Sequence, residues 1–213
     1  MVINNVQVIV ICVNYSDFLS ITYRENIKFF ERENYHIITT KEDKETIDLC
    51  NELKINYTCY NYFYKNSSYF NKSGAIYNMQ KILHEKYPYD WILLLDADII
   101  LPNNFDEIYN KNCTDKTALY SLERKDYEEE EDYKKLKNEV KYCGINFMGF
   151  MQLYFDKSKY YPKFSIDAST CDAIFRDHFY DTLKFLDKDS YLIHLGKNHV
   201  NNRGRITKKW NNL

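Results

Sequence analysis

The 213-residue sequence contains little glycine and proline, with five and three residues respectively. So few glycines leave little room for the glycine-built phosphate loops of Walker or dinucleotide-binding sites. Charge of one sign is also scarce, because 29 basic and 31 acidic residues leave a net charge of −2. Without a global positive field for holding a polyanion, we expect no nucleic-acid partner.

We also expect no export signal, no membrane-inserted segment and no cysteine-based site. The six cysteines include no C-x-x-C pair, so we expect reduced thiols in a cytoplasmic compartment, which would be the host cytoplasm if the source is viral. The apolar run at 6–13 has no basic residue before it and no cleavage site after it, which favours a buried strand over a signal peptide. The stretch 91–101 is too short for a membrane span, and we expect none.

Apolar and aromatic residues, in contrast, are plentiful at 45% and 17%, which is enough for the core of one domain. Tyrosine, lysine and asparagine are over-represented. Since their codons are rich in A and T, this usage indicates an AT-rich genome, such as that of some microbes or large DNA viruses.

Hydrophobic periodicity predicts alternating strands and helices over the first hundred residues. The expected strands are 6–13, 35–39, 55–64 and 91–95, and the expected helices are 18–31, 42–53 and 73–86. This alternation is typical of an α/β fold with a mostly parallel, Rossmann-like central sheet flanked by helices. In the second half we expect a solvated charged helix or a mobile flap at 123–141, a strand pair or a bent strand over 146–155, a helix at 167–179 and a strand at 191–195.

The most informative segment is WILLLDADIIL, in which a buried strand ends at Asp96 and Asp98. Residues two apart on a strand project to the same side, so the two carboxylates lie together at the carboxyl end of the strand. Open α/β sheets bind ligands at this end, and carboxylates with open positions suit Mg²⁺ or Mn²⁺ that also holds a diphosphate. The alternatives are a solvent-exposed turn and the D-x-D of haloacid-dehalogenase phosphatases, whereas Ile99 and Leu101 exclude a calcium loop.

An ordered set of segments resembles the GT-A-fold nucleotide-sugar glycosyltransferases, nearest to their large family-two-like group. The resemblance spans about residues 6–205, including the DxD strand, and departs from the family at Arg203, where a tryptophan is usual. The matching segments are Val13–Tyr15, TTKED at 39–43, FNKSGAIYN at 70–78, LDADIILP, GFMQLYF at 149–155, STCD at 169–172, HLG at 194–196 and NRGR at 202–205.

The resemblance implies a set of donor-binding residues and a Mn²⁺ or Mg²⁺ ion. Asp98 is expected as the direct metal ligand, Asp96 as a ligand through water or a ribose contact, and His194 as the third protein ligand. A satisfied core histidine is the alternative for His194, and a solvated lysine is the alternative for Lys72. The implied nucleotide-sugar contacts are Val13, Asn14, Tyr15, Thr39, Asp43, Lys72, Asn78, Asp96, Ala97, Asp98, Arg203 and Arg205.

Asp172 is the expected general base, since an acceptor hydroxyl must lose its proton as it attacks the anomeric carbon. Capping of a helix N-terminus is the alternative role for Asp172, and Asp167 is the rival base. The arginines at 203 and 205 are expected to clamp a diphosphate, and a basic tail without a binding function is the alternative. The acceptor is expected to stack on aromatic rings such as those of Tyr154, Tyr160, Tyr161 or Trp210.

Taken together, the resemblance implies one glycosyltransferase domain over 1–213, with a nucleotide-sugar-binding half (about 1–101) and an acceptor-binding half (about 102–213). The expected reaction moves one hexose or deoxyhexose from a nucleotide diphosphate donor, a UDP-sugar, to a glycan or glycoprotein acceptor with inversion. A catalytically silent sugar-nucleotide or glycan-binding module and a metal-dependent phosphohydrolase are the alternatives. The sequence sets neither the donor sugar nor the oligomeric state.

Overall fold

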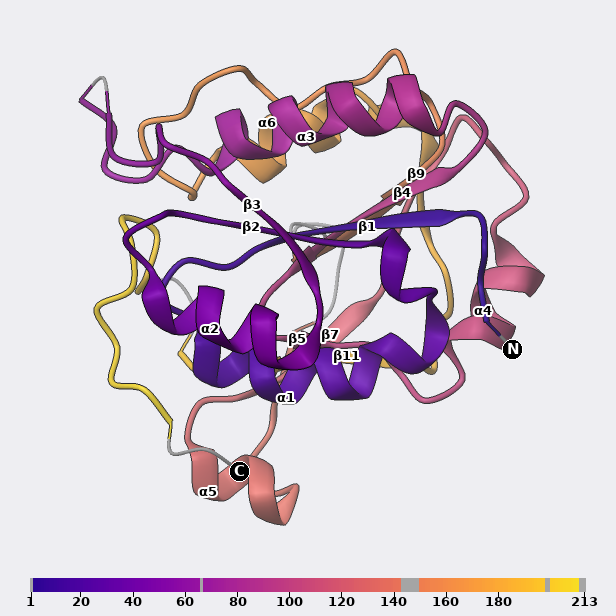
Figure 1. Cartoon of the computed structure of the whole chain (residues 1–213). Helices are drawn as coiled ribbons and strands as arrows, with labels where there is room; N and C mark the ends of the chain where they lie inside the picture. Colours follow the sequence, from indigo (N-terminus) through magenta and orange to yellow (C-terminus); the bar gives the residue numbers. More distant parts are fainter. Residues whose placement is uncertain (1, 66, 143–149, 198–199, 211–213) are drawn as a thin grey trace.

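The computed structural model describes residues 2–65, 67–142, 150–197 and 200–210 (Figure 1). Its centre is a seven-stranded sheet with the order β10-β6-β9-β4-β1-β2-β3. Strands β1 (Val6–Ile11), β2 (Tyr35–Thr39), β3 (Asn56–Cys59) and β4 (Trp91–Asp96) run parallel. Strand β9 (Met151–Tyr154) is antiparallel to β4 and to β6 (Leu119–Ser121), which pairs in parallel with β10 (Leu183–Phe185).

A second, four-stranded sheet has the order β5-β11-β7-β8. It consists of β5 (Ile99–Ile100), β11 (Tyr191–Leu195), β7 (Glu123–Tyr127) and β8 (Val140–Tyr142). Because β5 follows β4 after two residues, this small sheet begins where the central strand ends. In Figure 1 it lies beside α1, on the opposite side of the central sheet from α3.

Helices cover both faces of the central sheet (Figure 1). Helices α1 (Ser16–Asn26) and α2 (Lys44–Leu53) lie on one face, and α3 (Lys72–Lys86) and α6 (Cys171–Asp177) lie on the other. The chain also forms α4 (Phe105–Asn112), α5 (Glu130–Lys135) and short 3₁₀ turns at Ile27–Phe29, Arg32–Asn34 and Tyr180–Thr182. No helix within the described ranges is long and apolar enough to cross a membrane.

The α/β architecture with a mostly parallel sheet in a single domain is confirmed. Strands β1 and β4 are buried on both faces, as expected from their continuous apolar runs. Helix α3 begins after Asn71, whose side-chain oxygen accepts a hydrogen bond from the Gly74 backbone N–H at 3.0 Å. A Cβ added at Gly74 would lie 2.9 Å from the Lys163 carbonyl oxygen, so this helix start requires the missing side chain.

The prediction of one charged helix or flap over 123–141 is wrong. The segment forms strand β7, the six-residue helix α5 and the beginning of β8. Arg124 and Asp126 lie on the same, buried face of β7, and both side chains are fully buried. They form an ion pair with each other, so the strand buries two opposite charges together. Of the strand pair or bent strand expected over 146–155, the structure gives β9, and residues 143–149 lie outside the described residues.

Candidate functional site

A cavity of about 210 Å³ opens where β1 and β4 end, at the carboxyl edge of the parallel strands. Open α/β sheets bind their ligands at this edge. The cavity brings together residues from six separate parts of the chain, within 11–15, 70–72, 96–98, 150, 168–176 and 194–205. Nine of its lining residues are ones that the sequence resemblance singles out: Val13, Tyr15, Lys72, Asp96, Ala97, Asp98, Asp172, His194 and Arg205.

Asp98 and His194 meet at this cavity although they are far apart in the sequence. Strand β11 pairs antiparallel with β5, which sets His194 opposite Ile99 and next to Asp98. The Nε2 atom of His194 lies 3.6 Å from Asp98 Oδ2. Burial alone would lower the pKa of His194, but the carboxylates of Asp98 and Asp126 outweigh burial and raise the pKa to about 9.

These two residues form a donor set that fits a divalent cation. Asp98 Oδ1 is buried and has no hydrogen-bond partner within the described ranges, which leaves a carboxylate oxygen available as a ligand. Carboxylate oxygen and imidazole nitrogen together suit Mn²⁺, and water or diphosphate oxygens would complete its coordination. In the part of the chain that the structure describes, no three His, Cys, Asp or Glu side chains are arranged as a ready metal cage.

Lys72 lines the cavity and is buried between two carboxylates. Its Nζ atom lies 2.8 Å from Asp96 Oδ1 and 3.2 Å from Asp172 Oδ2. Burial would lower the pKa of Lys72, but Asp172 and Asp96 hold it well above the ordinary lysine value. Lys72 is therefore a charged group that joins the DxD strand to α6, which argues against a solvated surface lysine.

The carboxylate of Asp172 lies in the first turn of α6, and its two oxygens accept hydrogen bonds from different side chains. Lys72 donates to Oδ2, and the hydroxyl of Tyr161 donates to Oδ1 at 2.8 Å. Since these donors come from outside the helix, side-chain contacts rather than helix capping orient the carboxylate. Asp167 instead accepts hydrogen bonds from the backbone and hydroxyl of Ser169 and is not among the residues that line the cavity.

Three of the expected nucleotide contacts support the backbone behind the cavity. Asn14 has a left-handed φ of 62°, and its backbone N–H donates to Asp43 Oδ2 at 2.6 Å. The same carboxylate caps α2 through the Thr46 N–H and accepts a hydrogen bond from the Thr39 hydroxyl. This junction holds the ends of β1 and β2 together beside Val13 and Tyr15, which do line the cavity.

Two further residues lie away from the cavity. Asn78 is exposed on α3, and its side-chain amide donates to the Gly74 carbonyl at 2.9 Å. The exposed guanidinium of Arg203 stacks over the ring of Tyr69 with 4.3 Å to its centroid. Neither residue is among the cavity lining, so their donor contacts stay predictions.

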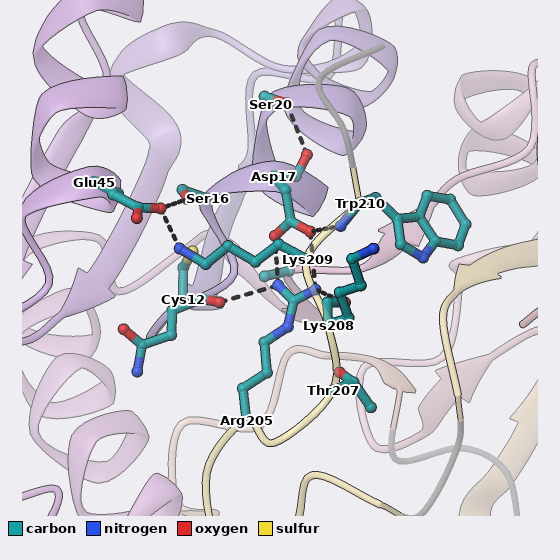
Figure 2. Close-up of polar contacts among 12 residues, drawn as sticks. Cys12, Ser16, Asp17, Ser20, Glu45, Arg205, Thr207, Lys208, Lys209 and Trp210 are labelled. Atoms are coloured by element: carbon teal, nitrogen blue, oxygen red, sulfur yellow. Dashed lines mark hydrogen bonds and ion pairs between the residues drawn. The ribbon is translucent and has the colours of Figure 1, made fainter. Parts of the chain in front are cut away.

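Arg205 lines the cavity, but its guanidinium also ties the C-terminal strap (residues 201–210) to α1, as Figure 2 shows. It pairs with both carboxylate oxygens of Asp17 and donates to the Asn14 carbonyl at 3.0 Å. Asp17 Oδ2 also accepts the backbone N–H of Trp210 at 2.8 Å. The indole of Trp210 packs on Phe18 with ring centroids 5.0 Å apart, so both the Asp17 carboxylate and an aromatic contact tie the strap to α1.

Two of the aromatic residues expected to stack on an acceptor have no free face. The side chains of Tyr154 and Tyr161 are buried, and their hydroxyls bond to Gln80 and to Asp172 and Gln152. They belong to the core network beneath the cavity.

Sequence reasoning missed three residues around the site, Asp17, Arg124 and Asp126, and it assigned Tyr161 to acceptor stacking instead of to the support of Asp172. The alternation in Glu123–Tyr127 was a usable signal, because residues 124 and 126 share one face of a strand. Asp17 and Tyr161 carry no such pattern, since only long-range contacts give them their place.

Neither a protein-family model nor a curated protein sequence matches the chain. Solved structures, in contrast, match most of the chain. The mannosyltransferase PcManGT from Pyrobaculum calidifontis, in complex with GDP-Man and Mn²⁺, aligns with a TM-score of 0.58 and 12% identity over 92% of this chain and 58% of its own. Residues 1–349 of S. aureus TarS align with a TM-score of 0.57 and 11% identity over 90% of this chain and 60% of TarS.

The chain has a GT-A-type fold. The expectation of a fold like that of the nucleotide-sugar glycosyltransferases is thereby confirmed. The chain spans about three-fifths of the length of these two structures.

Proposed function

We propose that the protein is a metal-dependent glycosyltransferase that moves one sugar from a nucleotide diphosphate donor, a UDP-sugar, to a glycan or glycoprotein acceptor with inversion. The observation that carries the proposal is the convergence of Asp96, Asp98, His194 and Asp172 on one cavity at the carboxyl ends of β1 and β4. In the similar mannosyltransferase structure, the bound molecules are GDP-Man and Mn²⁺.

The donor side of the proposed site consists of the cation ligands and the wall near β1. Asp98 and His194 would hold Mn²⁺ or Mg²⁺, and Asp96 would contact the ion through water or the donor ribose. The bound cation would neutralise the negative charge that develops on the departing nucleoside diphosphate. Val13, Tyr15 and Ala97 line the wall on which the nucleotide would rest.

On the acceptor side, Asp172 would take the proton of the attacking hydroxyl. The new bond forms between that oxygen and the anomeric carbon, and the bond from the anomeric carbon to the diphosphate oxygen breaks. Each carboxylate oxygen has two lone pairs, so Asp172 keeps an acceptor position beside its bonds to Lys72 and Tyr161. These two bonds fix the direction in which the carboxylate faces the cavity.

A thermal-shift series with nucleoside diphosphates and nucleotide sugars, each with and without Mn²⁺, tests the proposal. A donor at about 100 times its Kd stabilises the fold by about 2.7 kcal/mol, which raises the Tm of a chain of this size by roughly 5–11 °C. We expect this shift for one nucleotide base and only with the metal. The variant Asp98→Asn keeps the side-chain shape and should lose the metal-dependent part.

Each alternative function predicts a different result. A silent binding module would give the same shift but neither transfer nor donor hydrolysis. A phosphohydrolase would release inorganic phosphate from simple esters and show no preference among bases. The absence of any metal-dependent shift across the series would contradict the glycosyltransferase proposal.

A further inference from the structure

The buried side of His194 is occupied by a carboxylate that the expected metal site does not include. Strands β7 and β11 run parallel, and their register sets Asp126 directly beside His194. His194 Nδ1 lies 3.2 Å from Asp126 Oδ2, whereas Nε2 is the atom that faces Asp98. The two imidazole nitrogens therefore face two different carboxylates.

The two carboxylates differ in their access to the cavity. Asp98 and His194 line the cavity, and Asp126 does not. The side chain of Asp126 is 1% exposed, compared with 14% for Asp98. A cation that enters the cavity can therefore reach Asp98 and Nε2, while Asp126 can act only through the ring of His194.

Asp126 is itself held in place by a buried arginine. Arg124, two residues earlier on the same face of β7, donates from Nε to Asp126 Oδ1 at 2.7 Å. The guanidinium carbon of Arg124 lies 3.6 Å from the centroid of the Phe150 ring, which in turn packs edge-on against His194 at 5.0 Å. The Phe150 ring thus contacts both Arg124 and His194, and the Asp126 carboxylate lies next to both of them.

We infer that Asp126 is a positioning residue for cation binding by His194. Its carboxylate, 3.2 Å from Nδ1, favours the tautomer with the proton on that nitrogen and so leaves the lone pair of Nε2 beside Asp98. A metal-ligating histidine needs such a partner, because an unrestrained ring can rotate or carry its proton on the ligating nitrogen. The inference rests on the proposed function only in requiring that Asp98 and His194 bind a divalent cation.

Titration with Mn²⁺ alone, followed by electron paramagnetic resonance of the free ion, tests the inference without any donor or acceptor. We expect Asp126→Asn to weaken Mn²⁺ binding by about 10- to 100-fold, the usual effect of losing such a partner. Lys125→Gln is the matched control, because Lys125 lies on the same strand and pairs with Glu139 instead of His194. It should bind Mn²⁺ like the wild type.

A double-mutant cycle separates positioning from a general structural effect. If Asp126 acts through the ring, then Asp126→Asn should not weaken Mn²⁺ binding further in a His194→Ala background. Equal weakening in both backgrounds would overturn the inference, as would wild-type affinity in Asp126→Asn. Absence of Mn²⁺ binding by the wild type would overturn the proposed metal dependence as well, whereas a wild type that binds Mn²⁺ and an Asp126→Asn variant of equal affinity would overturn the inference alone.

A measurement on the wild type covers the case in which Asp126→Asn does not fold. Nitrogen-15 histidine spectra with and without Mg²⁺ should show that His194 keeps its Nδ1 proton and carries none on Nε2 when the ion is bound. Retention of a proton on Nε2, or loss of the proton from Nδ1, would overturn the inference.

Discussion

Replacement of Lys72 by methionine should destabilise the protein and make its stability depend on pH in a new way. The ammonium of Lys72 lies between the carboxylates of Asp96 and Asp172, and its side chain is only 9% exposed. Methionine keeps most of the buried volume but removes the positive charge. The two carboxylates are then left near each other without the group that neutralises them.

The magnitude follows from the burial of the three groups. Removing one partner of a buried ion pair costs about 3–5 kcal/mol. The side chains of Asp96 and Asp172 are 26% and 20% exposed, so water in the cavity can solvate part of their charge. We therefore expect a loss at the lower end of that range, about 3 kcal/mol at pH 8.

The pH dependence has a definite sign. Burial raises the pKa of Asp96 to about 6 even though Lys72 opposes the shift. Without Lys72 this pKa rises further, so the folded variant binds a proton more readily than the unfolded chain does. Its stability therefore increases as the pH falls through that pKa, and the difference from the wild type should be smaller at pH 5 than at pH 8.

Urea denaturation of the wild type and Lys72→Met at both pH values measures this difference. Lys81→Met is the matched control, because Lys81 is exposed on the same helix and should change the unfolding free energy by less than about 0.5 kcal/mol. A loss below about 1 kcal/mol for Lys72→Met, the median for an exposed pair, would refute the argument. So would a loss that is the same at pH 5 and pH 8.

Three other perturbations test neighbouring parts of the site. Because the folded-state pKa of His194 is raised to about 9, its contribution to stability is complete below about pH 6.5 and is lost as the pH rises through 9 in metal-free protein. Tm measured over this range should fall for the wild type and fall less for His194→Gln. Asp17→Ala removes the buried acceptor that fixes the C-terminal strap, so trypsin should cleave within residues 203–209 faster, whereas Glu45→Ala, which removes only exposed contacts to Ser16 and Lys209, should change the rate far less. Asp172→Asn should keep donor affinity within a few-fold and reduce transfer by about 10²–10⁴-fold, measured as product formation, with unchanged transfer excluding it as the base.

The elements of the first hundred residues could be predicted because each has one simple pattern of apolar residues, either a nearly continuous run or a helical spacing. Val6–Ile11 and Trp91–Asp96 are apolar except at Gln7 and Asp96, and burial on both faces is the arrangement that such runs permit. The strand expected at 55–64 is shorter, Asn56–Cys59, because the tyrosine-rich residues that follow turn away from the sheet. The hydrophobic period therefore located these elements better than it located their ends.

Charge content misled the interpretation of the second half. A segment with many charged side chains favours an exposed helix when the residues are considered one at a time. Arg124 and Asp126 instead neutralise each other inside a strand, and the cost of burying them is offset by a pairing that no local pattern reveals.

Within the site, the sequence could predict the positions of residues that directly follow a regular strand. Asp96 and Asp98 follow directly from the strand before them. The partners that fix the chemistry depend on strand register and helix packing: Asp126 beside His194, and Lys72 beside Asp172.

The support of Asp172 shows why these distant partners matter. Helix α6 has only seven residues and no side-chain cap at Thr170, so local interactions alone would leave it marginal. Lys72 of α3 and Tyr161 of the loop before α6 both contact Asp172 in the first turn of α6. Gln152 of β9 donates to the Asp172 carbonyl at 3.2 Å. The proposed base on such a short helix can keep its direction only if these tertiary contacts hold it. We therefore expect changes at Tyr161 or Gln152 to act on catalysis through the orientation of Asp172, although neither residue is in the lining of the cavity.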